Sequence, residues 1–168
     1  MLGKSHAVFG LGSYLLAGVT VLQQDYSFVE WVIFTPLALI GSLFPDLDHH
    51  NSRIKRNFFI KLASIPLTLF GHRTWSHSIL IMLAMTSLYF FVPEALLLGL
   101  VAFLIGYASH IIGDWMTPNG VPLFWPLKTK FRSPLNFRTG SWIEYPFALI
   151  PLGAFGLIFY SNIDTFLS

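Results

Sequence analysis

Three stretches of the sequence place histidines and carboxylates at spacings that suit metal binding. The chain has no cysteine, so any bound metal must be held by its six histidines and eight acidic residues, which offer nitrogen and oxygen ligands. In SHIIGD, His110 and Asp114 are four residues apart and share one helical face, where an imidazole and a carboxylate can bind the same ion. The residue types therefore point to a nitrogen and oxygen metal site.

The stretch PDLDHH brings several ligands together at a turn. Asp46, Asp48 and His49 follow Pro45 at the end of an apolar run, so their side chains can converge without competing for one helical face. Aspartate and histidine are suitable ligands for zinc-type ions. We predict that all three contribute to the metal site, and that Asp46 or Asp48 orients a water molecule or accepts its proton.

The stretch GHRTWSHS contributes two further imidazoles. His72 lies in the expected turn and His77 begins the next apolar run, with Arg73 between them. An arginine at this position can make a bidentate contact to a phosphate. It also fits the simpler interpretation of a charge that only sets the orientation of the chain in a membrane.

Two more candidates lie at the ends of apolar runs. His6 opens the first run, and Glu144 stands at the start of the last, where it either completes the metal site or extends to lipid headgroups. Taken singly, the candidates have simpler interpretations: Asp46 and Asp48 can cap a helix, and His6 or His72 can face solvent. Taken together, histidines and acids without cysteine favour a metal site.

The composition identifies the elements that must position these residues. Of 168 residues, 54% are hydrophobic and 11% are charged, whereas a soluble domain averages about 25% charged residues. We therefore expect one membrane-embedded domain over residues 1–168, folded as an all-α, polytopic helical membrane protein. A signal peptide within residues 1–22 is disfavoured, because a single lysine precedes a glycine-rich segment with no clear cleavage site.

Six apolar runs outline the expected helices. A perpendicular helix needs about 20 residues to cross a bilayer, so runs of this length must take turns from their flanks. Residues 58–70 contain Pro66 and would form a helix of only about 20 Å. We predict a re-entrant or interfacial helix there and about five transmembrane helices elsewhere. The runs are 7–22, 28–44, 58–70, 79–92, 95–112 and 145–160.

The basic residues support this topology. If residues 58–70 do not cross, every Lys and Arg lies on one side of the membrane, and the positive-inside rule places the N-terminus in the cytoplasm and the C-terminus outside. All histidines then share the cytoplasmic side, where the ligand stretches meet. The basic residues are Lys4, Arg53, Lys55, Arg56, Lys61, Arg73, Lys128, Lys130, Arg132 and Arg138.

Small residues recur at helical spacing in two of the runs and predict close helix packing. They place His6 within one packing seam and His110 beside the other. The connection 117–141, rich in Pro, Trp and Arg, is expected to lie along the headgroups, so anionic lipid is a closer partner than nucleic acid. The two seams are Gly3, His6, Gly10, Ser13 and Ala17, and Gly99, Ala102, Gly106, Ser109 and Gly113.

In order, and across roughly residues 3–146, these motifs resemble the YdjM-type family of LexA-regulated inner-membrane proteins regarded as metal-dependent hydrolases. The shared features are an early histidine, PDLDHH, GHRTWSHS, SHIIGDWMTPNGVPLFWPL and the basic FRSP. The two blocks GHR…SHS and SH…D…TP.GVPL.WP make the match specific, whereas the last apolar run matches only in character.

The resemblance implies a membrane-embedded helical protein with a zinc-type site, and a distant likeness to the phospholipase C and P1-type nuclease fold, which binds two or three zinc ions through a helical HxxxD pair. Its link to the SOS response is a promoter property that this chain does not show. His50 falls outside the family pattern. Carried over, His110 and Asp114 are the HxxxD pair, and the remaining ligands are His6, Asp46, Asp48, His49, His72 and His77.

The preferred hypothesis is a membrane-bound hydrolase, dependent on zinc or another divalent metal, that acts on a lipid or lipid-linked phosphoester at the cytoplasmic face of the bacterial inner membrane. The alternative is a non-catalytic, metal-stabilised membrane protein such as a metal sensor or carrier. A carrier should place polar groups at mid-membrane depth, whereas the centres of these runs are almost free of ionisable residues. A catalytic and a structural metal site need the same ligands, so the sequence does not separate them.

Overall fold

The computed structural model describes residues 1–48 and 75–164, and the regular structure in these ranges is helical apart from one β-bridge between Val121 and Phe131. The prediction of an all-α protein is therefore confirmed. The expected helix 58–70 lies outside the described residues, as do His49, His72, Arg73 and the side chain of Asp48.

Each described apolar run forms a helix or a pair of short helices. The second run is broken at Phe34, and the run that begins at Ile79 ends in a 3-10 turn. The α-helices are α1 (Gly3–Thr20), α2 (Phe28–Ile33), α3 (Thr35–Leu43), α6 (Ile79–Ser87), α7 (Glu94–Trp115) and α8 (Glu144–Ser161). The 3-10 helices are η1 (Leu22–Gln24), η2 (Pro45–Asp48), η4 (Trp75–His77) and η5 (Leu88–Phe90).

Local sequence explains where several helices begin. Ser27 and Glu30 form a capping box at α2, in which the Ser27 amide donates to the Glu30 carboxylate at 2.8 Å, and this satisfies amides that have no partner inside the helix. Pro36 lies in the first turn of α3, where its missing amide costs nothing, and the same ring interrupts α2 before it. Ser78 caps α6 through the Ile81 amide.

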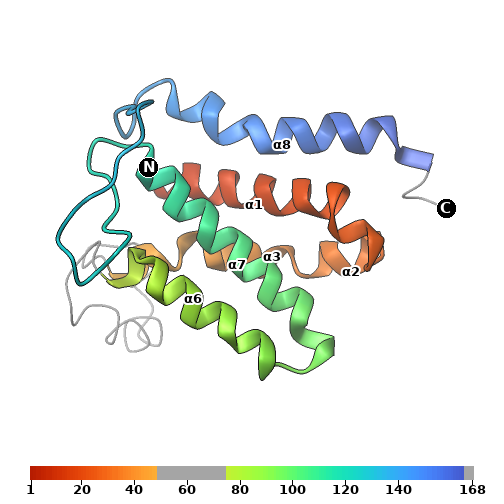
Figure 1. The fold of residues 1–168 in the computed structure, drawn as a ribbon. Helices are drawn as coiled ribbons and strands as arrows, with labels where there is room; N and C mark the ends of the chain where they lie inside the picture. The colour runs from red at the N-terminus through yellow and green to blue at the C-terminus, as the bar shows by residue number, and fades with distance from the viewer. Residues whose placement is uncertain (49–74, 165–168) are drawn as a thin grey trace.

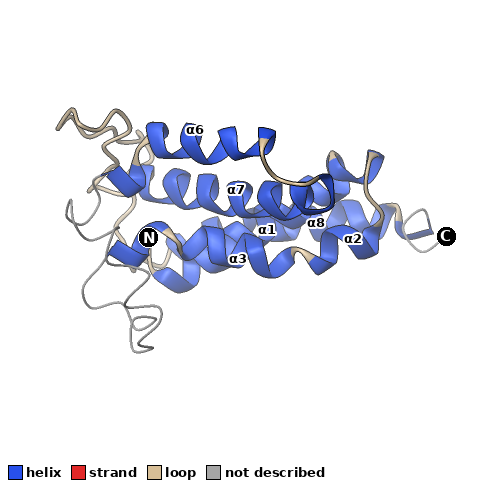
Figure 2. Ribbon diagram, turned by 90° about the horizontal axis from the view of Figure 1, so that it is seen from below, coloured by secondary structure: helices blue, strands red, loops and turns tan. Residues whose placement is uncertain are grey.

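The helices lie side by side along one long axis (Figures 1 and 2). Helix α1 packs against α3, α7 and α8, and α3 packs against α7. The N-terminus and the connection 117–141 lie at one end of the bundle, which we call the site end, and the C-terminus lies at the opposite, far end. Successive helices therefore carry the chain back and forth between two ends.

The outward surfaces of the bundle are strongly apolar. Phe90 and Phe91 are each 81% exposed and Leu157 is 76% exposed, whereas His110 and Asp114 have no exposed surface. Large exposed apolar areas mark contacts with lipid or with other proteins. Within the described ranges, α7 is the helix long and apolar enough to cross a bilayer.

Glycines let α3 and α7 approach closely. A Cβ atom on Gly106 would lie 2.0 Å from the Ala38 carbonyl oxygen, and one on Gly41 would lie 2.1 Å from the Phe103 carbonyl oxygen. Neither distance is possible for a real side chain, so the two backbones touch only because both residues are glycine. The seam predicted from small residues along residues 99–113 is therefore a site of close contact between helices.

We predict that Gly106→Ala lowers the thermal unfolding temperature of the detergent-solubilised protein, because the added methyl group must push α3 and α7 apart. Overpacking of this kind costs about 1–3 kcal/mol. Gly153→Ala in α8 is the matched control, since nothing lies within 4 Å of its Cβ position. Equal unfolding temperatures for the two variants would contradict the close contact between α3 and α7.

Candidate metal centre

Among the described residues, four fully buried ionisable side chains meet at the site end of the bundle. His6 comes from α1, His77 from η4, and His110 and Asp114 from the last turns of α7, and none of them has exposed surface. Asp46, in η2 directly after α3, joins them with 29% of its side chain exposed. A buried charge costs several kcal/mol unless other groups compensate it, so these side chains depend on one another.

Asp114 is at the centre of this cluster. Its Oδ1 accepts a hydrogen bond from His6 Nε2 at 3.2 Å and contacts the α-amino group of Met1 at 2.5 Å. Its Oδ2 lies 3.5 Å from His77 Nε2 and 3.8 Å from His110 Nε2. Three imidazoles from three separate segments thus surround one carboxylate.

The protonated nitrogen of two rings follows from their partners. His110 Nδ1 lies 2.7 Å from the Ser42 carbonyl oxygen, which can only accept, so Nδ1 carries the hydrogen and a neutral ring keeps its lone pair at Nε2. His6 donates through Nε2 to Asp114, so its lone pair is at Nδ1. Histidine ligands of metals commonly donate their other N–H to a carbonyl or carboxylate in this way.

Two overlapping sets of residues have the geometry to hold an ion: His6, Asp46 and His110, and His77, His110 and Asp114. In each set the ligand atoms lie within 4.8 Å of one another, and several separations of 3.5–3.8 Å approach the roughly 3.3–3.6 Å between tetrahedral ligands of zinc. His110 keeps one lone pair, so it binds one ion only.

Buried atoms without hydrogen bonds support the fit of a metal to this donor set. Among the described residues, His6 Nδ1 and His110 Nε2 are buried and have no hydrogen-bond partner, and both are lone pairs by the argument above. Their rings stack with centroids 3.7 Å apart and an interplanar angle of 13°. Two protonated rings at this distance would repel each other, so the arrangement favours the neutral form that binds metals.

A small residue makes room for this stack. Gly113 faces His6, and a Cβ atom at position 113 would lie 3.1 Å from His6 Cε1. Because α7 has no side chain at this point, α1 comes close enough for His6 to reach His110 and Asp114. The packing seam predicted from the sequence thus lies beside the predicted ligands.

The comparison with known proteins agrees with these motifs. The family described as YdjM inner membrane protein matches residues 1–165. The chain belongs to the YdjM family. The inner membrane protein YdjM of Escherichia coli (strain K12) is 33% identical over 143 residues, which cover 80% of this chain and 70% of that protein. The uncharacterized protein YvsG of Bacillus subtilis (strain 168) is 37% identical over 147 residues, which cover 86% of this chain and 85% of YvsG.

Membership of the YdjM family confirms the expectation of an inner-membrane protein. No solved structure gives a significant match. The likeness to the phospholipase C and P1-type nuclease fold therefore stays a prediction.

Glu144 is buried in the YdjM-family structure but lies in neither set of ligands. Its Oε1 accepts a hydrogen bond from the Leu2 amide at 2.7 Å, and its Oε2 accepts one from the Gly140 amide at 2.6 Å. The carboxylate therefore fastens the start of α1 to the connection that precedes α8. It positions backbone at the site end and does not join His110 and Asp114.

Three supporting residues were not predicted from the sequence as part of the metal site. They are Ser42, whose carbonyl accepts from His110, Ser76, whose hydroxyl lies 2.9 Å from His77 Nδ1, and Tyr107, whose hydroxyl donates to the Ser76 carbonyl. Of these, only Tyr107 could have been identified from the sequence, because it stands three residues before His110 and so lies on the same face of α7.

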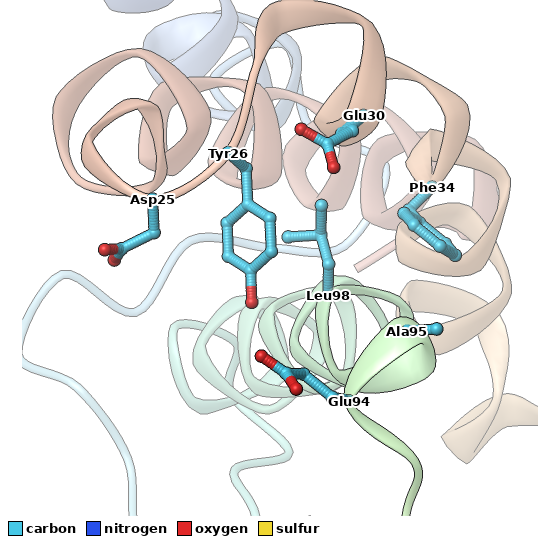
Figure 3. A pocket seen from close by; sticks show the side chains of 7 residues that line it. All are labelled: Asp25, Tyr26, Glu30, Phe34, Glu94, Ala95 and Leu98. Atoms are coloured by element: carbon cyan, nitrogen blue, oxygen red, sulfur yellow. The ribbon is translucent and has the colours of Figure 1, made fainter.

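A polar cavity, separate from the metal centre, lies at the far end of the bundle (Figure 3). It has a volume of about 580 Å³ and is lined by the carboxylates of Asp25, Glu30 and Glu94 together with Tyr26. Glu30 already serves in the capping box of α2. This cavity adjoins the start of α7, whereas His110 and Asp114 lie at its end, so the two places are separate.

We predict that Asp114→Ala lowers the zinc content of the detergent-purified protein, measured by mass spectrometry of the metal, below the two ions expected of a two-metal hydrolase. The reason is that Asp114 faces all three candidate histidines of the described residues, His6, His77 and His110. Glu144→Gln is the control: it keeps one acceptor oxygen, and we expect it to lower the unfolding temperature while the zinc content stays unchanged. A loss of zinc in Glu144→Gln would instead make Glu144 a ligand.

Proposed function

We propose that this YdjM-family protein is a membrane-bound, zinc-dependent hydrolase of a lipid or lipid-linked phosphoester. The observation that carries the proposal is the convergence of His6, His77, His110 and Asp114 at one end of an apolar bundle. Ionisable groups at membrane depth are costly and are typically kept for function. Buried imidazole lone pairs beside carboxylates are what a zinc site requires.

Because the two candidate sets share His110, the described residues would hold one ion, and the remaining motifs would complete a second site. His110 has one available lone pair, whereas Asp114 has two oxygens directed at different histidines, so Asp114 would hold metal through either oxygen. We assign the other ligands to the predicted residues of PDLDHH and GHRTWSHS. They are Asp48, His49 and His72.

Bound zinc would supply a Lewis acid that polarises a phosphoryl oxygen and makes a water molecule more acidic. Asp46 is the residue we assign to receive that proton, because it is the one partly exposed member of the two ligand sets and so lies between the buried histidines and solvent. Arg73 would hold a non-bridging phosphate oxygen through its planar guanidinium.

An apolar hollow beside the site end supports a lipid substrate. Its volume is about 460 Å³, and its inner wall includes Phe137 and Phe147, which belong to an apolar cluster with Phe9 and Met1. Met1 in turn contacts Asp114. That contact is made by the α-amino group of Met1, so the apolar cluster ends next to the metal centre. The other residues lining the hollow are Leu135, Ile143, Pro146 and Ile150.

Exposed basic residues lie on the connection 117–141, which also contributes to the apolar hollow. Anionic phospholipids attract such clusters by about 1 kcal/mol per basic residue near the membrane surface, and this would keep phosphate headgroups close to the metal centre. The residues are Lys128, Lys130, Arg132 and Arg138.

The complete burial of three histidines and Asp114 also fits the second candidate, a structural metal site, because structural zinc sites are closed. The exposure of Asp46 favours catalysis, since a catalytic site must admit water and substrate. A hydrolysis assay separates the two candidates, because only a catalytic site turns over substrate.

The proposed topology has five membrane crossings with the N-terminus and the site end in the cytoplasm. In the described part of the chain, α1, α2 with α3, α6, α7 and α8 connect the two ends in alternation, and the two termini lie at opposite ends. Lys4 belongs to the first turn of α1, which starts at the site end beside the basic connection, so the positive-inside rule favours the site end as the cytoplasmic one.

We predict that a cysteine replacing Asn136 reacts with a membrane-impermeant thiol reagent only from the cytoplasm, and one replacing Gln24 only from outside. Both positions are exposed and lie at opposite ends of the bundle, and the chain has no cysteine to give a background signal. Labelling of both positions from the same side would contradict the topology.

We predict that the protein in phospholipid vesicles hydrolyses one member of a panel of phospholipids and isoprenoid phosphates, and that chelation or His110→Ala abolishes the activity. Loss of an outer partner alone costs about 10–100-fold in metal affinity or activity, so removal of a ligand should cost more. Gly153→Ala, far from the centre, should keep full activity. Zinc-loaded protein that is inactive on the whole panel would favour the structural site.

A further inference from the structure

We propose that Tyr107 and Ser76 are positioning residues that hold His77 in place as a metal ligand, an inference that rests on the proposed metal centre. The Tyr107 hydroxyl donates to the backbone carbonyl of Ser76, and the Ser76 hydroxyl lies 2.9 Å from His77 Nδ1. All three residues are buried. They form a hydrogen-bonded path from the core of α7 to the ring of His77.

The path is needed because His77 lies on a weak element. Helix η4 has three residues, and such short 3-10 turns have poor hydrogen-bond geometry of their own. His6 and His110, in contrast, lie on helices of 18 and 22 residues. A precise position for His77 must therefore come from a contact outside its turn, and the Tyr107 hydroxyl provides one.

The position of Tyr107 on α7 ties three parts of the centre together. Residues 107, 110 and 114 share one face of the helix, because they are separated by three and four residues. The same rigid helix thus presents two ligands, His110 and Asp114, and the hydroxyl that fixes the turn of a third. Any shift of η4 along α7 would move His77 Nε2 away from Asp114 Oδ2, now 3.5 Å distant.

Ser76 also bears on which ring nitrogen of His77 carries the hydrogen. For His77 to bind an ion through Nε2, its hydrogen must be on Nδ1, and the Ser76 hydroxyl oxygen can accept it. A hydroxyl can also donate, so Ser76 tolerates the opposite tautomer, in which Nε2 carries the hydrogen toward Asp114. The Ser42 carbonyl opposite His110 can only accept, so His110 has no such freedom.

Tyr14 provides a matched control for Tyr107. Both tyrosines have no exposed surface, and both donate a hydrogen bond from the phenolic oxygen to a backbone carbonyl, Tyr14 to that of Trp31 at 2.8 Å. Trp31 belongs to α2, away from the metal centre. Loss of either hydroxyl should lower the stability of the protein similarly, whereas only its loss at Tyr107 should change metal binding.

The test compares Tyr107→Phe, Ser76→Ala, Ser76→Thr and Tyr14→Phe in detergent-solubilised, full-length protein. Zinc affinity is measured by competition with a chromogenic chelator, and the coordination is monitored by the visible absorption of bound Co²⁺. We expect Tyr107→Phe and Ser76→Ala to lower zinc affinity about 10–100-fold and to change the Co²⁺ spectrum. Ser76→Thr, which keeps the hydroxyl, and Tyr14→Phe should match the wild type.

The outcomes distinguish the two proposals. A wild-type protein that binds neither zinc nor Co²⁺ overturns the metal centre and this inference with it. A wild-type protein that binds both, with unchanged affinity and spectrum in Tyr107→Phe and Ser76→Ala, overturns the positioning role and leaves the centre intact. If Tyr107→Phe does not fold, Ser76→Ala against Ser76→Thr decides, because both keep the backbone carbonyl that Tyr107 contacts.

Discussion

The burial of the Asp114 carboxylate is the constraint on which the site end depends. A carboxylate without exposed surface must be surrounded by donors or by a cation, because an isolated buried charge costs several kcal/mol. Asp114 is compensated by the histidines of α1 and η4 and by the amino group of Met1. Since these groups are distant in the sequence, the carboxylate couples the positions of three segments, and removing it would leave several polar groups without their common partner.

Close packing of the helices makes this convergence possible. Imidazole side chains are short, so α1, α3 and α7 must approach within reach of a single carboxylate. Contacts at Gly10, Gly106 and Gly113 permit it: a Cβ atom on Gly10 would lie 2.3 Å from Ser42 Cβ. The contact of α3 with α1 and α7 also brings the Ser42 carbonyl to His110 Nδ1. The close approach of the helices at these glycines therefore also fixes the orientation of the His110 ring.

The parts of the structure that follow helical periodicity were predictable from the sequence. The pair His110 and Asp114 on one helical face and the small-residue seam of α7 are of this kind. The backbone partners of Glu144 were not, because a carboxylate near a membrane looks alike in sequence whether it binds metal, lipid or amides. The contact of Tyr107 with Ser76 joins residues 31 positions apart, and a backbone carbonyl as acceptor imposes no residue type that a pattern could reveal.

The two kinds of histidine partner would have different consequences for the proposed metal centre, which would exist with and without an ion. His110 faces a carbonyl, so its neutral ring always directs a lone pair inward and is prepared to bind. His77 faces a hydroxyl, so its ring can direct either a lone pair or an N–H toward Asp114. In the proposed metal centre, the N–H form would stabilise the buried carboxylate before an ion binds, and the lone-pair form would complete the ligand set afterwards. In the proposed centre, His110 would be a ligand of fixed orientation and His77 one that can change its tautomer. Asp114 could then stay buried both with and without an ion, whereas histidines that all donate to carbonyls would leave it without a donor.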